Sequence, residues 1–463
     1  MKNILSKLHT ILHVKKQGLI LGKGYNVITE KKGLITVPYD VMNRHIYILG
    51  ATGAGKTSLL RNIVYQLIND GWGVLFIDLK GENNILTDMW QACIRANRRK
   101  DFIYFSPIRS EKFMTETAVW NPLIHGDASV VTSRLMDAFG TDNPEAEFYE
   151  KVKYDILYAI ISCMKETNMV FNFKDMSWVL QSAQNMKKLA HITPMGQAKQ
   201  ILTSIINDWI DNPKVYVTYI KGTKVAVQEM ATGLASEICN ATEPTLDLAD
   251  AVEKKLVIYS YLPTMYAKAS MRAIGKMMLS ELKNVFANIQ AYVRGKARFA
   301  IVIDEFEELA FKSVKDMFNK ARSAGVSMIV GHQTLSDINY EIRSVEFTKS
   351  LMDNTACKLI MQVNSRETAE MLAGIIGEYP PLPFLDRYIK ARWIVPPDVL
   401  MGKNAIYDSG LDVGELIAKV EGDIYRVKVY NPNSDLEIGR DFPRPAPRYE
   451  KYCYGKALDI ENT

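Results

Sequence analysis

The chain has 463 residues, of which 48% are hydrophobic and 24% are charged. These fractions are typical of a globular protein, and the length predicts two or three domains. The 57 basic and 52 acidic side chains give a net charge of +5, which permits a nucleic-acid or acidic-membrane partner but requires any basic surface to be local. No run of 18 consecutive apolar residues occurs, so no segment is predicted to span a membrane. The five cysteines form no Cys-x-x-Cys pair, which argues against a disulfide framework or a zinc module and fits a reducing compartment.

Residues 1–16 place apolar side chains on one helical stripe with lysines around it. This pattern indicates a basic amphipathic helix that lies on a membrane or docks on a partner. The pattern also fits an ordinary helix packed against the body of the protein, and we favour this second interpretation. The longest apolar run is too short for a secretory signal.

Residues 45–82 contain the strongest local pattern. HIYIL predicts a buried strand, GATGAGKT a glycine-rich turn, SLLRNIVYQLIND a helix, and GVLFIDLKGE a second buried strand. This order indicates a right-handed βαβ unit in a parallel sheet.

The glycine-rich turn matches the pattern G-x-x-x-x-G-K-[ST]. Its glycines let successive backbone N–H groups face phosphate oxygens, and the helix that follows directs its positive end at them. Lys56 would bridge the β- and γ-phosphates, and the Thr57 hydroxyl would bind Mg²⁺. The predicted cofactors are therefore ATP and Mg²⁺. The predicted nucleotide-binding residues are Gly50, Ala51, Thr52, Gly53, Ala54, Gly55, Lys56, Thr57 and Ser58.

An apolar strand over FAIVIDE ends in two acidic residues, Asp304 and Glu305. Asp304 is the predicted Mg²⁺ partner, through water, and Glu305 is the predicted general base or water-orienting group. Paired with a phosphate loop far upstream, the doubled acid indicates ATP hydrolysis rather than simple nucleotide binding.

Two further residues are candidates for the same site. If SMIVGHQ is the strand beside that of Asp304, then Gln333 emerges where it could sense the γ-phosphate; a turn glutamine satisfied by the backbone is the alternative. Arg322 ends the preceding helical segment and could reach a neighbouring subunit's nucleotide, or it could be a solvated arginine. Asp78, Lys80 and Glu82 follow the second strand of the βαβ unit and are either positioning residues or a charged surface turn.

The pattern of apolar residues along the rest of the chain predicts the domain boundaries. From 128 to 246 long helical periods replace short apolar runs, beginning with a helix that we expect Asn143 to cap and Pro144 to open. Strand patterns then return over KKLVIYSYLP, SMIVGHQ and CKLIMQV, and residues 415–430 predict an antiparallel hairpin at the sheet edge, turning at Glu421-Gly422. The expected buried face of the helix that Pro144 opens comprises Phe148, Val152, Ile156, Ile160 and Met164.

We therefore expect an α/β fold: a RecA-like P-loop domain with a mostly parallel central sheet, interrupted by an all-helical insertion. The expected parts are an amphipathic segment (1–22), a nucleotide-binding domain in two pieces (23–127 and 247–430), the insertion (128–246) and a tail containing proline and arginine (431–463).

With these pieces assembled, the chain resembles the type IV secretion coupling proteins of the TraD/TraG/TrwB kind, within the FtsK–HerA group of translocases. The resemblance covers roughly residues 18–430. It rests on RHIYILGATGAGKT, FIDLKGE, WNPL, VIYSYLPTMY, FAIVIDEFEEL, KARSAGVSMIVGHQT and RWIVPPDVLMG.

The resemblance implies a hexameric P-loop ATPase with a central channel for single- or double-stranded DNA. Such a protein brings a relaxase–DNA complex to a conjugation channel at the inner membrane. Lys56, Thr57, Asp304 and Glu305 match the family's nucleotide residues. Gln333 resembles its coupling glutamine, and Arg322 resembles a trans arginine finger.

One departure concerns the membrane. Family members usually begin with two transmembrane helices, whereas this chain begins with the amphipathic segment. Either this member is recruited by a membrane partner, or the anchor lies outside the sequence given. We expect a cytoplasmic protein associated with the inner membrane through partners or that helix. Two alternatives remain open: a DNA translocase outside conjugation, and an adaptor that couples protein effectors without DNA contact.

Overall fold

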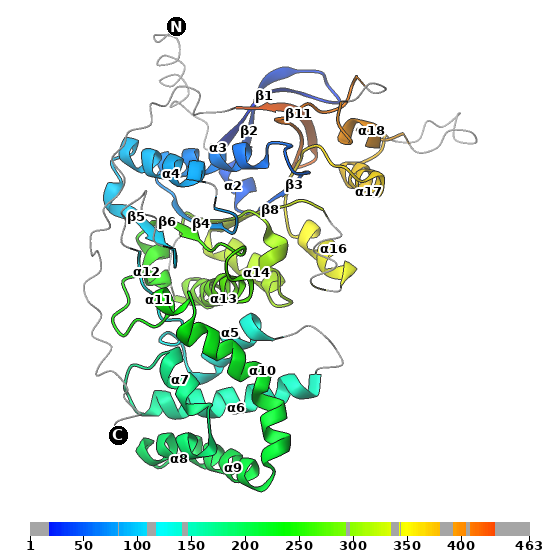
Figure 1. Cartoon of the computed structure of the whole chain (residues 1–463). Coiled ribbons are helices and arrows are strands. Elements are labelled where there is room, and N and C mark those ends of the chain that lie inside the picture. Colours follow the sequence, from blue (N-terminus) through cyan, green and yellow to red (C-terminus); the bar gives the residue numbers. More distant parts are fainter. Residues whose placement is uncertain are drawn as a thin grey trace. The chain divides into compact units, whose positions relative to one another are not determined.

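A computed structural model describes residues 18–81, 83–108, 117–140, 147–292, 297–334, 342, 344–379, 392–403 and 408–430 (Figure 1). Three groups of sequence predictions lie outside these residues: the amphipathic stretch 1–16, the tail 431–463, and the roles of Glu82, Asn143 and Pro144. The chain forms two compact units. Unit 1 comprises residues 1–74, 295–307 and 321–438, and unit 2 comprises residues 75–294, 308–320 and 439–463.

Unit 1 is built on strands that join a parallel half to an antiparallel half. The order is β2-β1-β11-β10-β9-β3-β8-β7. β9, β3, β8 and β7 pair in parallel, and the other pairs are antiparallel. The bounds are β1 (Gly18–Asn26), β2 (Lys32–Pro38), β3 (Ile46–Leu49), β7 (Phe299–Ile303), β8 (Val326–His332), β9 (Cys357–Ile360), β10 (Glu415–Val420) and β11 (Asp423–Val429).

Helix α3 (Lys56–Asn69) is fixed to the antiparallel half by its side chains. Gln66 Oε1 accepts the N–H of Ile20 in β1, and Gln66 Nε2 donates to the Ile20 carbonyl, both at 2.8 Å. Asn62 Nδ2 of the same helix also donates to the Ile20 carbonyl, at 3.0 Å. The side chains of α3 thus pair backbone groups of β1. The other helices of unit 1 are α2 (Tyr39–Met42), α16 (Val345–Asp353), α17 (Arg366–Ile376) and α18 (Pro397–Leu400), and α14 (Val314–Ala324) has residues in both units.

Unit 2 contains β4 (Gly73–Asp78), β6 (Val257–Tyr261) and β5 (Phe102–Phe105), in that order. Its helices beside these strands are α4 (Asn83–Arg95), α12 (Leu248–Glu253) and α13 (Lys268–Tyr292). Every described element between β5 and α12 is helical, as expected. These elements are α5 (Ala128–Phe139), α6 (Glu147–Glu166), α7 (Phe173–Val179), α8 (Ala183–Ile192), α9 (Gln197–Asp211), α10 (Pro213–Thr232) and α11 (Ser236–Cys239). A short 3-10 helix, η1 (Arg99–Asp101), directly precedes β5.

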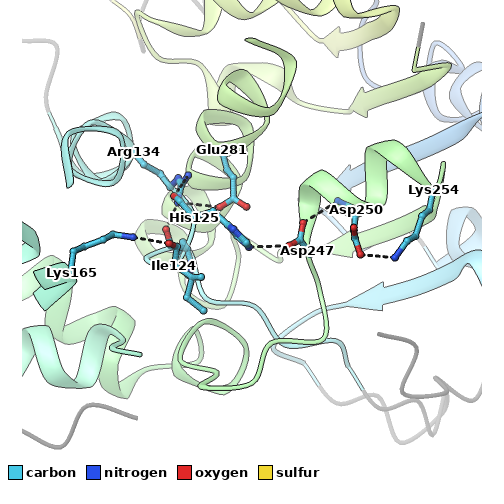
Figure 2. A network of polar contacts seen from close by, with 9 residues as sticks. Ile124, His125, Arg134, Lys165, Asp247, Asp250, Lys254 and Glu281 are labelled. Carbon is cyan, nitrogen blue, oxygen red and sulfur yellow. Dashed lines mark hydrogen bonds and ion pairs between the residues drawn. The ribbon is translucent and has the colours of Figure 1, made fainter. Parts of the chain in front are cut away.

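A buried polar network holds the base of this helical block together (Figure 2). Arg134 in α5 pairs with Glu281 in α13 at 3.1 Å, and both side chains are at most 3% exposed. His125 Nε2 lies 3.0 Å from an oxygen of Asp247, the residue that caps α12. Lys165 of α6 donates to the Ile124 carbonyl at 2.6 Å. The segment that leads into the helical block, at Ile124 and His125, and the segment that leaves it, at Asp247, are therefore linked to each other and to α6.

Two sequence expectations are wrong in detail. The 415–430 hairpin exists and turns at Glu421-Gly422, where both residues have positive φ, but it is internal: β11 pairs with β1 and β10 with β9. Within α6, Phe148 is 61% exposed. The buried face begins only at Ile156. In the first turn, the Phe148 ring contacts Tyr219 of α10 edge-on, with centroids 5.7 Å apart, and keeps most of its surface in solvent.

A helix that crosses a bilayer needs about 20 predominantly apolar residues. No helix within the ranges given above is both long and apolar enough to do so.

Candidate nucleotide-binding site

The glycine-rich loop connects the buried strand β3 to α3. The helix begins at Lys56, and its N-cap, Gly55, has a φ of 106° and contributes no side-chain cap. The first turn of α3 therefore directs its N–H groups and the positive end of the helix dipole at the loop, which is the arrangement that favours an anion. Thr57 and Ser58 lie half-buried in this turn.

Lys56 is folded into the loop. Its side chain is buried, with 6% exposed, and Nζ donates to the carbonyls of Gly50 at 2.5 Å and Ala51 at 3.2 Å. An ammonium group held against carbonyl dipoles at the mouth of the loop provides the positive charge that phosphate oxygens require.

A distant glycine supports the loop from behind. Gly414 N donates to the Ala54 carbonyl at 3.0 Å, and a Cβ placed on Gly55 would lie 3.3 Å from the Gly414 backbone. This close approach, together with the positive φ of Gly55, requires glycine at position 55. The loop thus depends on the segment that leads into β10.

A glutamine at the end of β8 contacts the loop, and it links the loop to two acidic residues at the end of β7. Thr52 Oγ1 donates to Gln333 Oε1 at 2.7 Å, and Gln333 Nε2 donates to Glu305 Oε1 at 3.1 Å. Asp304 is 7% exposed, and one of its oxygens accepts the Glu305 N–H at 3.1 Å. Residues from three separated segments of sequence are therefore brought together, as expected from the parallel pairing of β7 with β8.

The residues present fit a Mg²⁺-bound nucleoside triphosphate. The uncapped first turn of α3 and the buried ammonium group suit phosphate oxygens, and a hydroxyl and a carboxylate are hard oxygen ligands of the kind that Mg²⁺ takes beside phosphate. Within the described ranges, no cluster of three or more histidine, cysteine, aspartate or glutamate side chains is arranged to hold a metal ion.

Arg322 lies apart from this group. It occupies the last turn of α14 and is exposed. Among the described residues, no hydrogen bond or ion pair joins its side chain to the loop, the two acids or Gln333. Within this chain it is therefore not part of the same cluster.

Asp78 is a structural residue within unit 2. It is 3% exposed, and its Oδ1 accepts the N–H groups of Lys80 at 2.9 Å and Gly81 at 2.7 Å. Its Oδ2 accepts from the hydroxyl of Tyr259. The carboxylate thus stabilises the turn after β4. It is buried, so it does not belong to a charged surface turn, which was one of the two predicted roles. Lys80 itself is exposed.

Sequence reasoning missed His332, a fully buried histidine between the glycine-rich loop and Gln333. Its carbonyl accepts the Gly50 N–H at 3.4 Å, and its ring contacts Tyr47 of β3 and the Thr334 carbonyl. The available signal was its position directly before the glutamine at the end of an apolar strand.

Comparison with known proteins gives matches in both halves of the P-loop core. Residues 298–381 match the family described as the TraM recognition site of TraD and TraG. Residues 26–97 match the central domain of helicase HerA. The type 4 coupling protein DotL of Legionella pneumophila is 20% identical over 393 residues, covering 73% of this chain and 50% of DotL. The chain thus spans about half the length of this curated relative.

Solved structures give the same result at the level of fold. The plasmid coupling protein TrwB in complex with ADP and Mg²⁺ matches with a TM-score of 0.61 at 16% identity, covering 88% of this chain and 89% of TrwB. The chain is similar to type IV coupling proteins. VirB4 of Thermoanaerobacter pseudethanolicus matches with a TM-score of 0.53 at 16% identity, covering 90% of this chain and 97% of VirB4. The expected resemblance to coupling proteins and the expected RecA-like α/β fold are both confirmed.

Proposed function

We propose that this chain is a Mg²⁺-dependent P-loop ATPase that acts as a coupling protein in type IV secretion. The observation that carries the proposal is the hydrogen-bonded path from Thr52 through Gln333 to Glu305. It supports Glu305 as the general base, because ATP hydrolysis requires a base close to the bound phosphates and this path links Glu305 to the loop that suits them.

The residues divide the work as follows. The residues of the loop, 50–58, bind the phosphates, and Lys56 neutralises the charge that develops on the transferred group. Thr57 and Asp304 would hold Mg²⁺, which would neutralise phosphate charge. Glu305 accepts the proton of the attacking water, and Gln333 orients the Glu305 carboxylate.

The proposed cargo is a relaxase–DNA complex delivered to a conjugation channel. The similarity to DotL and TrwB and the match to a TraM recognition site support a role with relaxosome and channel proteins. We further propose a hexameric ring at the inner membrane, with Arg322 completing the site of a neighbouring subunit, and an insertion domain bounded by residues 128 and 246.

Two alternatives have specific support. The match to the HerA central domain favours a DNA translocase that acts outside conjugation. The second is an adaptor that couples protein effectors without DNA contact, and similarity to a type 4 coupling protein fits this adaptor as well as it fits DNA delivery.

The test is ATP hydrolysis against protein concentration, with and without single- and double-stranded DNA, at low and moderate salt. We expect turnover per subunit to rise with concentration and with DNA, and the DNA stimulation to weaken with salt because phosphate contacts release counterions. Hydrolysis that ignores DNA would favour the effector adaptor.

Lys56→Ala separates this activity from contaminating ATPases. We expect it to abolish hydrolysis, because the ammonium group at the loop is lost. Lys31→Ala, which removes an exposed lysine in the turn between β1 and β2, is the matched control and should hydrolyse ATP like wild type. Turnover retained in Lys56→Ala would exclude the loop from the active site.

A further inference from the structure

The residues between the glycine-rich loop and Gln333 form a buried contact chain. His332 is the last residue of β8, and its ring lies edge-on to that of Tyr47, with centroids 4.9 Å apart. One ring nitrogen, Nδ1, is 2.9 Å from the Thr334 carbonyl. The other, Nε2, is in hydrogen-bond contact with the Tyr47 hydroxyl. We term these three residues the histidine brace.

The chemistry of these partners fixes the tautomer. A carbonyl oxygen only accepts hydrogen bonds, so Nδ1 of His332 must carry the proton that bonds Thr334. Nε2 is then an acceptor, and the Tyr47 hydroxyl donates to it. Both ring nitrogens are thus used, and the ring has one orientation in which both bonds form.

The charge state agrees with this assignment. Burial, with a smaller contribution from the Lys56 cation, lowers the pKa of His332 to about 4. Burial and the Glu307 carboxylate raise the pKa of Tyr47. At neutral pH the ring is therefore uncharged and the phenol protonated, as the two hydrogen bonds require.

The histidine brace holds the residues on both sides of Gln333. Thr334, directly after the glutamine, is held through its carbonyl by the His332 ring, and His332, directly before it, accepts the Gly50 N–H through its own carbonyl. The backbone of residue 333 is thus fixed relative to β3, and its side chain can reach Thr52 on one side and Glu305 on the other.

We propose that His332 is a positioning residue for ATP hydrolysis, acting through Gln333, and that its Nδ1–H bond to Thr334 is the contact that matters. The proposal rests on the proposed ATPase function and adds a residue to it. His332 touches no reacting group; it determines where the Gln333 amide lies.

The test compares His332→Ala with His332→Asn. Alanine removes both ring contacts, whereas the asparagine amide places an N–H donor near the position of Nδ1 and can still bond the Thr334 carbonyl. We expect His332→Ala to lower kcat by about 10- to 100-fold, the range for loss of a group that orients a catalytic one. We expect the KM for ATP to change by less than about twofold, because the phosphate loop is unaltered, and His332→Asn to recover most of the lost kcat.

His45 provides a matched control in the same strand pair. It is also buried, with 1% exposed, and its Nδ1 accepts the Met328 N–H at 3.0 Å, before β3 begins and far from the loop. His45→Ala removes a buried imidazole hydrogen bond as well, so it should lower the thermal midpoint without selectively lowering kcat at temperatures where the variant is folded.

A second measurement does not require a variant to fold. Nitrogen-15 NMR of imidazole-labelled wild-type protein between pH 6 and 8 should find His332 neutral, with its proton on Nδ1. A proton on Nε2, or a charged ring, would overturn the brace.

The kinetic outcomes separate the two proposals. If wild type hydrolyses ATP and His332→Ala matches it, or His45→Ala loses as much kcat, or His332→Asn recovers nothing, only the positioning role is overturned. If wild type binds ATP but does not hydrolyse it, the proposed function and the positioning role are both overturned.

Discussion

Gln333 and Glu305 meet across the ends of β8 and β7, where the glutamine Nε2 donates to the glutamate Oε1 at 3.1 Å. Glu305 has a φ of 59°, a left-handed conformation that is uncommon outside glycine and that costs about 1–3 kcal/mol. The surrounding strands hold this strained residue with its carboxylate towards the glutamine. The proposed base is therefore held in place by the fold, which would lower the reorganisation needed during reaction.

Glu305→Gln should bind ATP like wild type but lower its hydrolysis about 10²- to 10⁴-fold, because only the basic carboxylate is lost while an acceptor oxygen remains. Single-turnover hydrolysis and binding of a fluorescent ATP analogue measure the two effects. Glu30→Gln is the control: Glu30 is exposed and has a similar φ of 56° in the turn between β1 and β2. Wild-type turnover in Glu305→Gln would place the base elsewhere.

Gln333→Leu keeps the approximate volume of the side chain but removes both hydrogen bonds to Thr52 and Glu305. We expect kcat to fall by about 10- to 100-fold as the base loses its orientation. Gln66→Leu, which removes hydrogen bonds between α3 and β1, should lower stability without this loss of kcat. Equal kcat losses in the two variants would contradict a specific role for Gln333.

Arg322→Ala tests whether α14 completes a neighbour's site. If Arg322 acts in trans, mixing this variant with Lys56→Ala should restore part of the activity, because some interfaces then combine an intact loop with an intact arginine. Lys315→Ala, an exposed lysine on the same helix, should retain activity by itself. Mixed rings that stay as inactive as the separate variants would argue against a role in trans.

The His125–Asp247 pair should make unit 2 more stable in mildly acidic solution. Burial lowers the pKa of His125, but the hydrogen bond to Asp247 and the charges of Glu281 and Asp247 outweigh it and raise the pKa above its ordinary value. A raised histidine pKa adds stability that is complete below pH 6.5 and is lost as pH rises through the folded value. The pKa of Asp247 is lowered by His125 and by the backbone N–H of Asp250, which outweigh burial, so its contribution is lost only as pH falls below about 4.

Thermal unfolding of wild type and His125→Asn at pH 5.5 and 8.5 measures this effect. We expect the difference between the two midpoints to be larger at pH 5.5. His191→Asn removes an exposed histidine of α8 and should show no such dependence. A larger difference at pH 8.5 would reverse the sign of the argument.

Glu281→Ala should destabilise unit 2 by about 3–5 kcal/mol, because it leaves the buried Arg134 guanidinium without its carboxylate. The double variant Arg134→Met, Glu281→Leu should recover most of that loss, since it removes both charges and fills the space with apolar atoms. Urea unfolding measures both. A double variant as unstable as Glu281→Ala would mean that the residues stabilise the base of the helical block other than through their charges.

The parts of the site that could be predicted from sequence are those in which neighbouring residues act together. The loop around Lys56 and the strand that ends in Asp304 can each be recognised from about ten consecutive residues. The position of Gln333 followed from assuming that β8 lies beside β7, which the structure confirms.

The rest depended on contacts between distant segments. β1 has glycines at 18, 22 and 24, which obscured its strand pattern, so the hairpin that pairs with it was placed at the edge. His332 gains its role from Tyr47 and the Thr334 carbonyl, neither of which its own sequence position reveals. Periodicity identifies the buried stripe of α6 but not where along the helix burial begins, and Phe148, which lies on the same stripe, is exposed.

The bond from Gly414 N to the Ala54 carbonyl has a consequence for the newly made chain. Ala54 leaves the ribosome early and Gly414 much later, and synthesis proceeds at about 5–20 residues per second. For tens of seconds the phosphate loop therefore exists without the backbone that supports it. Any nascent chain that ends before residue 414 should carry the complete P-loop sequence and still lack its finished shape.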